Sequence, residues 1–174
     1  MKVFLLIACL LILPTSSFAV DGYKNLKFGI NKEAVKKSKL CKFDEVPSVD
    51  GEIGEVLECE DFKFSGITTY AWAYFIDNKF LRLVFNLPEH QGIPVLDALT
   101  EKYGKASSFD STADFESVRL HPNRSAFISF DKDTIRVKMG STSENMIYYK
   151  IFYESPKYEQ MLLKNQKMGV KDSL

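Results

Sequence analysis

Few residues of this chain have the types and the spacing that catalysis requires. The two histidines, His90 and His121, stand beside Pro88 and Pro122. These positions predict exposed loop residues rather than a general base paired with a nucleophile. The chain contains no G-x-S-x-G elbow, no H-E-x-x-H pair and no glycine-rich phosphate loop. We therefore expect no catalytic residue, no metal site and no cofactor.

Acidic residues near Cys59 are the remaining candidates for chemistry. They are Glu52, Glu55, Glu58, Glu60 and Asp61. Two carboxylates that flank a substrate can hydrolyse a glycosidic bond. An envelope hydrolase that uses these acids is therefore an alternative function for the chain.

The aromatic content is the most unusual chemical feature of the sequence. Tyr70, Trp72 and Tyr74 alternate along a predicted strand, 68–76, so all three project from one of its sides. A second alternating row lies in the last predicted strand and consists of Tyr149, Ile151 and Tyr153. Tyrosine and tryptophan bury a large area while keeping a polar tip, which favours protein interfaces. We predict Tyr70, Trp72 and Tyr74 as a binding surface.

The alternative for these three residues is ordinary core packing. The returning strand of the same hairpin, 80–87, carries its own apolar row, made of Leu81, Leu83, Phe85 and Leu87. If the two rows share one face of the sheet, both belong to the core. If they lie on opposite faces, the aromatic row is free to bind a partner. Only the register of the hairpin decides between these two arrangements.

The elements that position these residues indicate an α+β domain. Helical signals cover residues 32–39, after an Asn31 cap, then 94–103, and the segment after Pro156. The predicted strands are 55–64, 68–76, 80–87, 115–120, 125–130, 134–139 and 146–153. Runs of strands joined by hairpins predict an antiparallel meander sheet packed by a few short helices. The order also allows two helix-plus-three-strand units.

The N-terminus has the layout of a secretory signal. Lys2 precedes an apolar run, 3–13, and small residues stand at Ser17 and Ala19. The run is shorter than the roughly 20 apolar residues of a spanning helix. We expect cleavage after Ala19 and no stable membrane insertion afterwards. The alternative is a lipobox, residues 6–9, which would place a lipid on Cys9.

Export determines what the mature chain should look like. Removing Lys2 leaves 22 basic against 23 acidic residues, and this balance does not favour nucleic-acid binding. Cys41 and Cys59 remain, and paired cysteines are usual in an oxidising compartment. We predict a disulfide between them, a single domain over residues 20–166 and a flexible tail over 167–174.

Two stretches carry a resemblance to a known group of proteins. Residues 28–35 read Phe-Gly-Ile-Asn-Lys-Glu-Ala-Val, and residues 99–105 read Leu-Thr-Glu-Lys-Tyr-Gly-Lys. These stretches and the element order resemble small bacterial envelope domains with the BamE or β-lactamase-inhibitor-protein type of fold. The resemblance implies a binding scaffold without catalytic residues, such as an assembly factor, an inhibitor or an immunity-type protein.

Taken together, the sequence predicts a non-enzymatic, periplasmic or secreted protein that binds another protein through its sheet. Recognition of a small apolar ligand or a glycan by the same aromatic face is the alternative within binding functions.

Overall fold

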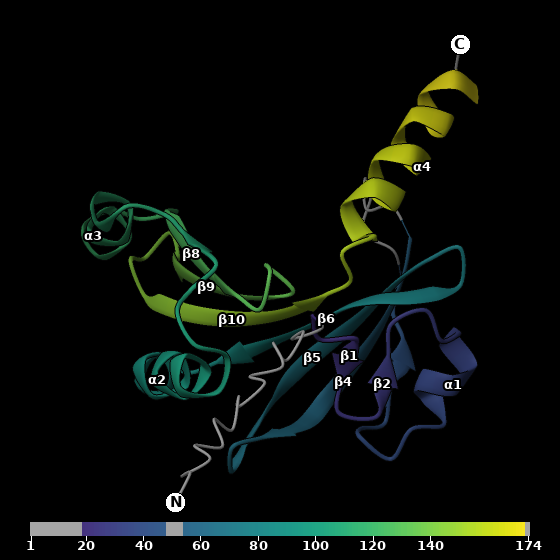
Figure 1. Ribbon diagram of the computed structural model, residues 1–174, viewed down its shortest axis with the longest axis horizontal. Coiled ribbons are helices and arrows are strands. Elements are labelled where there is room, and N and C mark those ends of the chain that lie inside the picture. The colour runs from purple at the N-terminus through teal and green to yellow at the C-terminus, as the bar shows by residue number, and fades with distance from the viewer. Residues whose placement is uncertain (1–18, 48–53, 173–174) are drawn as a thin grey trace, which may run out of the picture.

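The computed structural model describes residues 19–47 and 54–172. Within them the chain forms an eight-stranded antiparallel sheet, a two-stranded sheet and four α-helices, which confirms the predicted α+β class (Figure 1). The helices are α1 (Lys32–Lys36), α2 (Gly92–Tyr103), α3 (Thr112–Leu120) and α4 (Tyr158–Asp172), with a 3-10 turn, η1 (Glu89–Gln91), before α2. The predicted signal segment lies outside the described residues, apart from Ala19. In the described part, no helix has the length and apolar character needed to cross a membrane.

The large sheet is built from two meanders that meet along one seam. Its strands are β3 (Asp44–Glu45), β4 (Glu55–Phe64), β5 (Ile67–Ile76), β6 (Lys79–Leu87), β7 (Ser108–Phe109), β8 (Ser125–Phe130), β9 (Ile135–Ser141) and β10 (Ile147–Glu154). Their spatial order is β3-β4-β5-β6-β10-β9-β8-β7. The small sheet pairs β1 (Gly22–Tyr23) with β2 (Leu26–Lys27). Helix α1 precedes the four strands β3–β6, and helix α3 precedes the three strands β8–β10.

One face of the large sheet carries the core. Helices α1, α2 and α3 and the β1–β2 sheet each bury apolar side chains against it. Figure 1 shows α1, α2 and the β1–β2 sheet on one side of the strands, and α4 rising on the other side. The covering side chains are Tyr23, Leu26, Val35, Val95, Leu99 and Val118. We call the opposite side of the sheet the open face.

The β5–β6 hairpin was predicted well, but its register contains a bulge. Asp77 and Asn78 both have positive φ and form the predicted two-residue turn. The strand pairing shifts next to the turn: Phe75 pairs with Phe80, whereas Tyr74 pairs with Arg82. Phe80 therefore takes the core position. Leu81 consequently projects to the open face, and its predicted place in the Leu83–Phe85 row was wrong. A bulge adds one residue to a strand, and alternation counted along the sequence misses it.

The predicted strand 115–120 was also wrong, because this segment belongs to helix α3. Ser111 caps the helix through a reciprocal pair of bonds with Asp114, a complete capping box. The apolar residues of the segment, Phe115 and Val118, stand three apart and therefore share one helical face. Val118 is fully buried in the core.

The helix boundaries also differ from the prediction. Helix α1 ends at Lys36, and α2 begins at Gly92 rather than at Pro94. Gly92 allows the ring of Tyr149 to pack against the start of α2, since a Cβ there would lie 2.4 Å from ring atoms. Helix α4 extends to Asp172, so residues 167–172 of the predicted flexible tail are helical.

Candidate binding surface on the open face

The structure places the predicted aromatic row on the open face of the sheet. Strand pairing sets Ala71 opposite Phe85 and Ala73 opposite Leu83, and these four residues face the core. Because side chains alternate, Tyr70, Trp72 and Tyr74 project to the other side. Tyr70 keeps 46% of its surface exposed, and the other two rings are half-buried. The aromatic row and the Leu83–Phe85 row therefore lie on opposite faces.

Trp72 is held in a fixed orientation by its neighbours. Its indole Nε1 donates a hydrogen bond of 2.8 Å to Oε2 of Glu58 on the adjacent strand. Its ring stacks on Tyr70, with 6.2 Å between centroids and 18° between planes. The ammonium group of Lys150 lies 5.4 Å from the Trp72 ring centroid. A hydrogen bond and two ring contacts thus order a large side chain that water still reaches.

Tyr74 lies in a different environment from the other two rings. Helix α4 begins beside it, and Tyr158 of that helix forms a small apolar cluster with Ile76 and Leu81, against which Tyr74 packs. The guanidinium of Arg82 lies 3.6 Å from the Tyr158 ring centroid and 5.9 Å from that of Tyr74. Tyr74 therefore belongs to the junction between sheet and helix, whereas Tyr70 and Trp72 form the accessible part of the row.

The open face continues across the seam onto residues that the sequence reasoning missed. One row of paired positions runs across six strands through Glu58, Trp72, Val84, Phe152, Arg136 and Ser129. The next row runs through Asn86, Lys150, Lys138 and Phe127. Tyr148 extends this surface, and its ring lies against Gly140, where a Cβ would stand 2.4 Å from the ring. Aromatic and cationic side chains thus occur together over both meanders.

Cations lie over aromatic rings throughout this surface. Arg136 lies 5.1 Å from the centroid of Phe127 and 5.6 Å from that of Phe152. Lys138 also lies over Phe127, at 5.7 Å. Glu154 accepts a 2.6 Å hydrogen bond from Nε of Arg82, and Arg136 approaches the same carboxylate at 3.5 Å. Such contacts hold long side chains in place, and the side chains of Arg82, Arg136 and Glu154 are only 18%, 29% and 11% exposed.

The second aromatic row of the sequence, Tyr149, Ile151 and Tyr153, belongs to the core. All three are buried on the covered side of β10. Burial raises the pKa of Tyr153, and burial also raises the pKa of Tyr149. The residues of β10 that reach the open face are their neighbours Tyr148, Lys150 and Phe152. Alternation in 146–153 indicated that the strand has two different faces, but it did not show which face the helices would cover.

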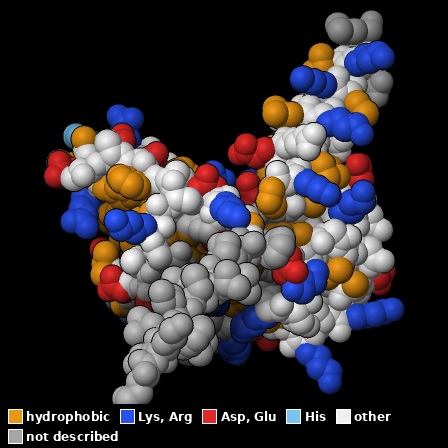
Figure 2. All heavy atoms as spheres, viewed as in Figure 1, with side chains coloured by type: hydrophobic (Ala, Val, Ile, Leu, Met, Phe, Trp, Pro, Cys, Tyr) orange, Lys and Arg blue, Asp and Glu red, His pale blue; other side chains and the backbone are white. Residues whose placement is uncertain are grey.

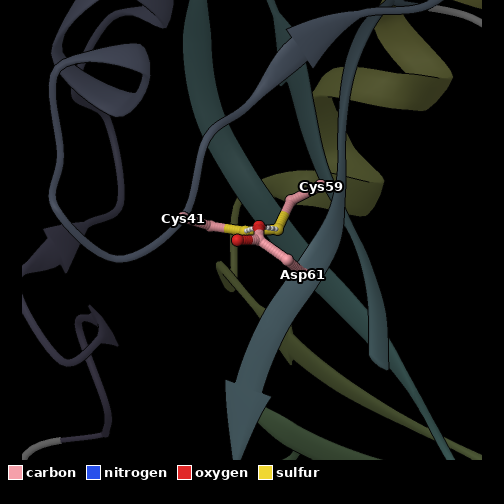
Figure 3. Close-up of side chains that lie close together, drawn as sticks. All are labelled: Cys41, Cys59 and Asp61. Atoms are coloured by element: carbon pink, nitrogen blue, oxygen red, sulfur yellow. Dashed lines mark hydrogen bonds between the residues drawn. A yellow bond between two sulfur atoms is a disulfide. The ribbon is translucent and has the colours of Figure 1, made fainter. Parts of the chain in front are cut away.

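Cys41 and Cys59 form the predicted disulfide at the edge of the sheet (Figure 3). Their Cα atoms lie 6.2 Å apart. The bridge ties the segment before β3 to β4 and so holds Phe43, 4% exposed, in the core. A carboxylate oxygen of Asp61 lies 3.2 Å from Sγ of Cys41 and 3.4 Å from Sγ of Cys59. This trio has the composition of a metal cluster, but sulfurs joined to each other are not available as thiolate ligands.

The acids proposed for hydrolysis are engaged separately or open to solvent. Glu58 accepts from Trp72, and Glu55 forms an ion pair with Lys32. Glu58, Glu60 and Asp61 nevertheless line one open depression of about 280 Å³ at the sheet edge, together with Lys42 and Asp44. Glu60 and Asp61 are exposed there. Glu52 lies outside the described residues.

A wider hollow lies between α2 and α3, and no sequence pattern predicted it. It has a volume of about 730 Å³ and is lined by Glu89, His90, Ile93, Arg119, Met139, Ile147 and Tyr149. Apolar residues form most of its wall, and Ile93 is 54% exposed there. His90 and His121 are both exposed, as predicted; His90 stands at this hollow and His121 caps the C-terminal end of α3.

Comparison with known proteins defines the family. The chain belongs to a family described as "Uncharacterised protein", whose profile matches residues 23–173 and so spans the fold from β1 to α4. An uncharacterised protein of Haemophilus influenzae is 33% identical over 166 residues, covering 93% of this chain and 92% of its relative. A protein of Pasteurella multocida is 27% identical, covering 97% of this chain and 93% of that protein. No solved structure matches the chain.

Proposed function

We propose that the mature chain is a non-enzymatic binding module that recognises another protein through the open face of its sheet. The observation that carries this proposal is the ordered aromatic and cationic surface around Trp72. Trp, Tyr and Arg are the residues that most often dominate binding energy at interfaces. Here their rotamers are held by hydrogen bonds and ring contacts before any partner arrives. Less side-chain entropy is then lost on binding.

We infer that the module works outside the cytoplasm, in the periplasm or as a secreted protein. The N-terminal sequence has a signal layout, and the structure contains a disulfide. Both relatives come from bacteria. An inhibitor, an immunity-type protein or an envelope assembly factor would use such a surface.

Trp72→Ala tests this proposal against the core interpretation. Phe85→Ala on the next strand is the matched control, because Phe85 is fully buried on the covered face. The control should cost about 3–5 kcal/mol of unfolding free energy. Trp72→Ala removes ring contacts and one hydrogen bond at a solvated site, and should cost about 1–2 kcal/mol. A partner captured from envelope extract by the mature protein should bind the Trp72→Ala variant at least about 30-fold more weakly than the parent, a loss of about 2 kcal/mol of binding free energy.

Two results would contradict this proposal. If denaturant titration shows Trp72→Ala losing as much stability as Phe85→Ala, the ring of Trp72 is part of the core. If stability is retained and the captured partner binds Trp72→Ala unchanged, the open face is not the binding surface.

The hollow between α2 and α3 favours a second candidate, binding of a small apolar ligand. Its apolar wall and size fall in the range of small-molecule sites. The fluorescent probe anilinonaphthalene sulfonate should bind the mature protein at this hollow and become more fluorescent. Ile93→Glu places a charge on the wall of the hollow and should abolish this increase in fluorescence. Unchanged probe fluorescence in Ile93→Glu would remove this candidate.

A further inference from the structure

Two lysines on the open face stand directly opposite each other. Lys150 of β10 pairs with Lys138 of β9 across the ladder. Both ammonium groups lie 6.0 Å from the centroid of the Tyr148 ring. Like charges at opposed positions destabilise a sheet. Burial and the charge of Lys138 lower the pKa of Lys150. The free protein therefore carries an electrostatic cost at this point.

No carboxylate in the described part of the chain offsets that cost. The two acids on the open face of the strand ladder, Glu58 and Glu154, are engaged elsewhere. Glu58 accepts the hydrogen bond of Trp72, and Glu154 accepts from Arg82. Among residues 19–47 and 54–172, neither Lys138 nor Lys150 has an ion-pair partner.

Building on the proposed function, we propose that Lys138 and Lys150 are the anion-recognising part of the open face and that its partner is a protein segment carrying carboxylates. Their charges would meet the partner's carboxylates, while Trp72, Tyr148 and Phe127 around them would bury its apolar atoms. Complementary charge of this kind raises the association rate and selects the partner.

A carboxylate-bearing segment of another protein fits both the charge and the rings of this site. The two guanidinium groups on this face, Arg82 and Arg136, already share the carboxylate of Glu154. Lys138 and Lys150 are left with ammonium groups that complement the carboxylates of a partner. Large rings surround them, and aromatic residues are enriched at protein interfaces. Helix α4 of a second copy is a poor match, because basic side chains lie along it (Figure 2) and its lysines would repel this pair.

The experiment uses the position of the only tryptophan in the chain. Because Lys150 lies over Trp72, an anion bound at the lysine pair changes the environment of the indole ring. The mature protein is titrated with a glutamate polymer of about 20 residues, with heparin, and with phosphatidylglycerol vesicles, while Trp72 fluorescence is followed. We expect a saturable, salt-sensitive response to the glutamate polymer. Lys138→Gln with Lys150→Gln should weaken it at least tenfold, whereas the matched double variant Lys105→Gln with Lys167→Gln should not.

The outcomes separate this inference from the proposed function. A response to heparin or vesicles alone would overturn the assignment to carboxylates, and so would an unchanged response in the Lys138 and Lys150 double variant. If the glutamate polymer fails while capture of an envelope protein still depends on Trp72, only the lysine assignment is wrong. If capture is independent of Trp72 as well, the proposed function fails with it. A thermal scan adds a second readout, because removing one of two repelling charges should leave the melting temperature of Lys138→Gln equal or higher.

Discussion

Signal cleavage should create a new ion pair in this protein. The backbone nitrogen of Val20 lies 2.5 Å from Oδ2 of Asp131 in the β8–β9 turn. Thr134 Oγ1 donates to the same carboxylate oxygen at 3.0 Å. In the precursor the Val20 nitrogen is an amide, whereas cleavage after Ala19 would make it a charged α-ammonium group. Val20, the predicted first residue of the mature chain, therefore already lies beside a carboxylate that can pair with its ammonium group.

The size of the effect follows from the kind of hydrogen bond. A neutral donor contributes about 0.5–1.5 kcal/mol and a charged one about 1.5–3 kcal/mol. Both residues are only partly buried, so we expect the low end, a gain of about 1 kcal/mol on processing. For a domain of about 150 residues this corresponds to roughly 2–4 °C in melting temperature.

The assay compares three forms of the protein: one that begins at Val20, one that retains a Gly-Ser extension, and one whose Val20 amine is acetylated. Each is also made with Asp131→Asn, which keeps the turn geometry because asparagine tolerates the positive φ found there. The free amine should melt 2–4 °C higher in the parent background and show no such advantage in Asp131→Asn. Equal melting of the three parent forms would refute the reasoning. Intact mass of the exported protein should begin at Val20, and a diacylglyceryl mass on Cys9 would contradict the cleavage itself.

Three further predictions rest on individual residues. Burial raises the pKa of Tyr23 to about 12; the unfolded chain therefore loses this proton first above pH 10, and stability should fall between pH 10 and 12, less steeply in Tyr23→Phe, as measured by denaturant titration. Peptide mapping without reductant should recover Cys41 linked to Cys59, and Cys59→Ser should cost about 2–5 kcal/mol; two alkylatable thiols in exported material would exclude the bridge. Ser111→Ala removes the cap of α3 and should cost about 1 kcal/mol in a thermal scan, whereas no change would mean that packing alone sets this helix end.

Local patterns allowed much of the fold to be predicted. Strand β5 and the turn at Asp77 and Asn78 follow from alternation and from residues that tolerate positive φ. Helix α3 was missed because Phe115 and Val118 sit in a segment short enough to fit either period, although the capping box at Ser111 was a readable helix signal. The bulge at Leu81 was not readable, since it depends on how two strands pair.

The candidate surface could be predicted only in part for the same reason. Tyr70 and Trp72 stand out in one strand, and their alternation is local. Lys138 and Lys150 meet through the local β9–β10 hairpin. They join Tyr70 and Trp72 only because β10 also pairs with β6, and nothing near the lysines in the sequence indicates that long-range pairing. Pairing between strands far apart in the chain decides which polar residues become neighbours in space. Propensity and periodicity report only on residues that are close in the sequence.

The seam between β6 and β10 also shapes how the chain must fold. Within each meander the strands are joined by short turns, so their pairing closes small loops. The seam instead joins Phe85 to Ile151, with α2 and α3 in the loop between them. Pairing over such separations costs more chain entropy and slows folding. We expect the meanders to form early and the seam late. Until it closes, β6 and β10 each present an unpaired edge to other chains, whereas in the finished sheet the outermost strands, β3 and β7, are only two residues long.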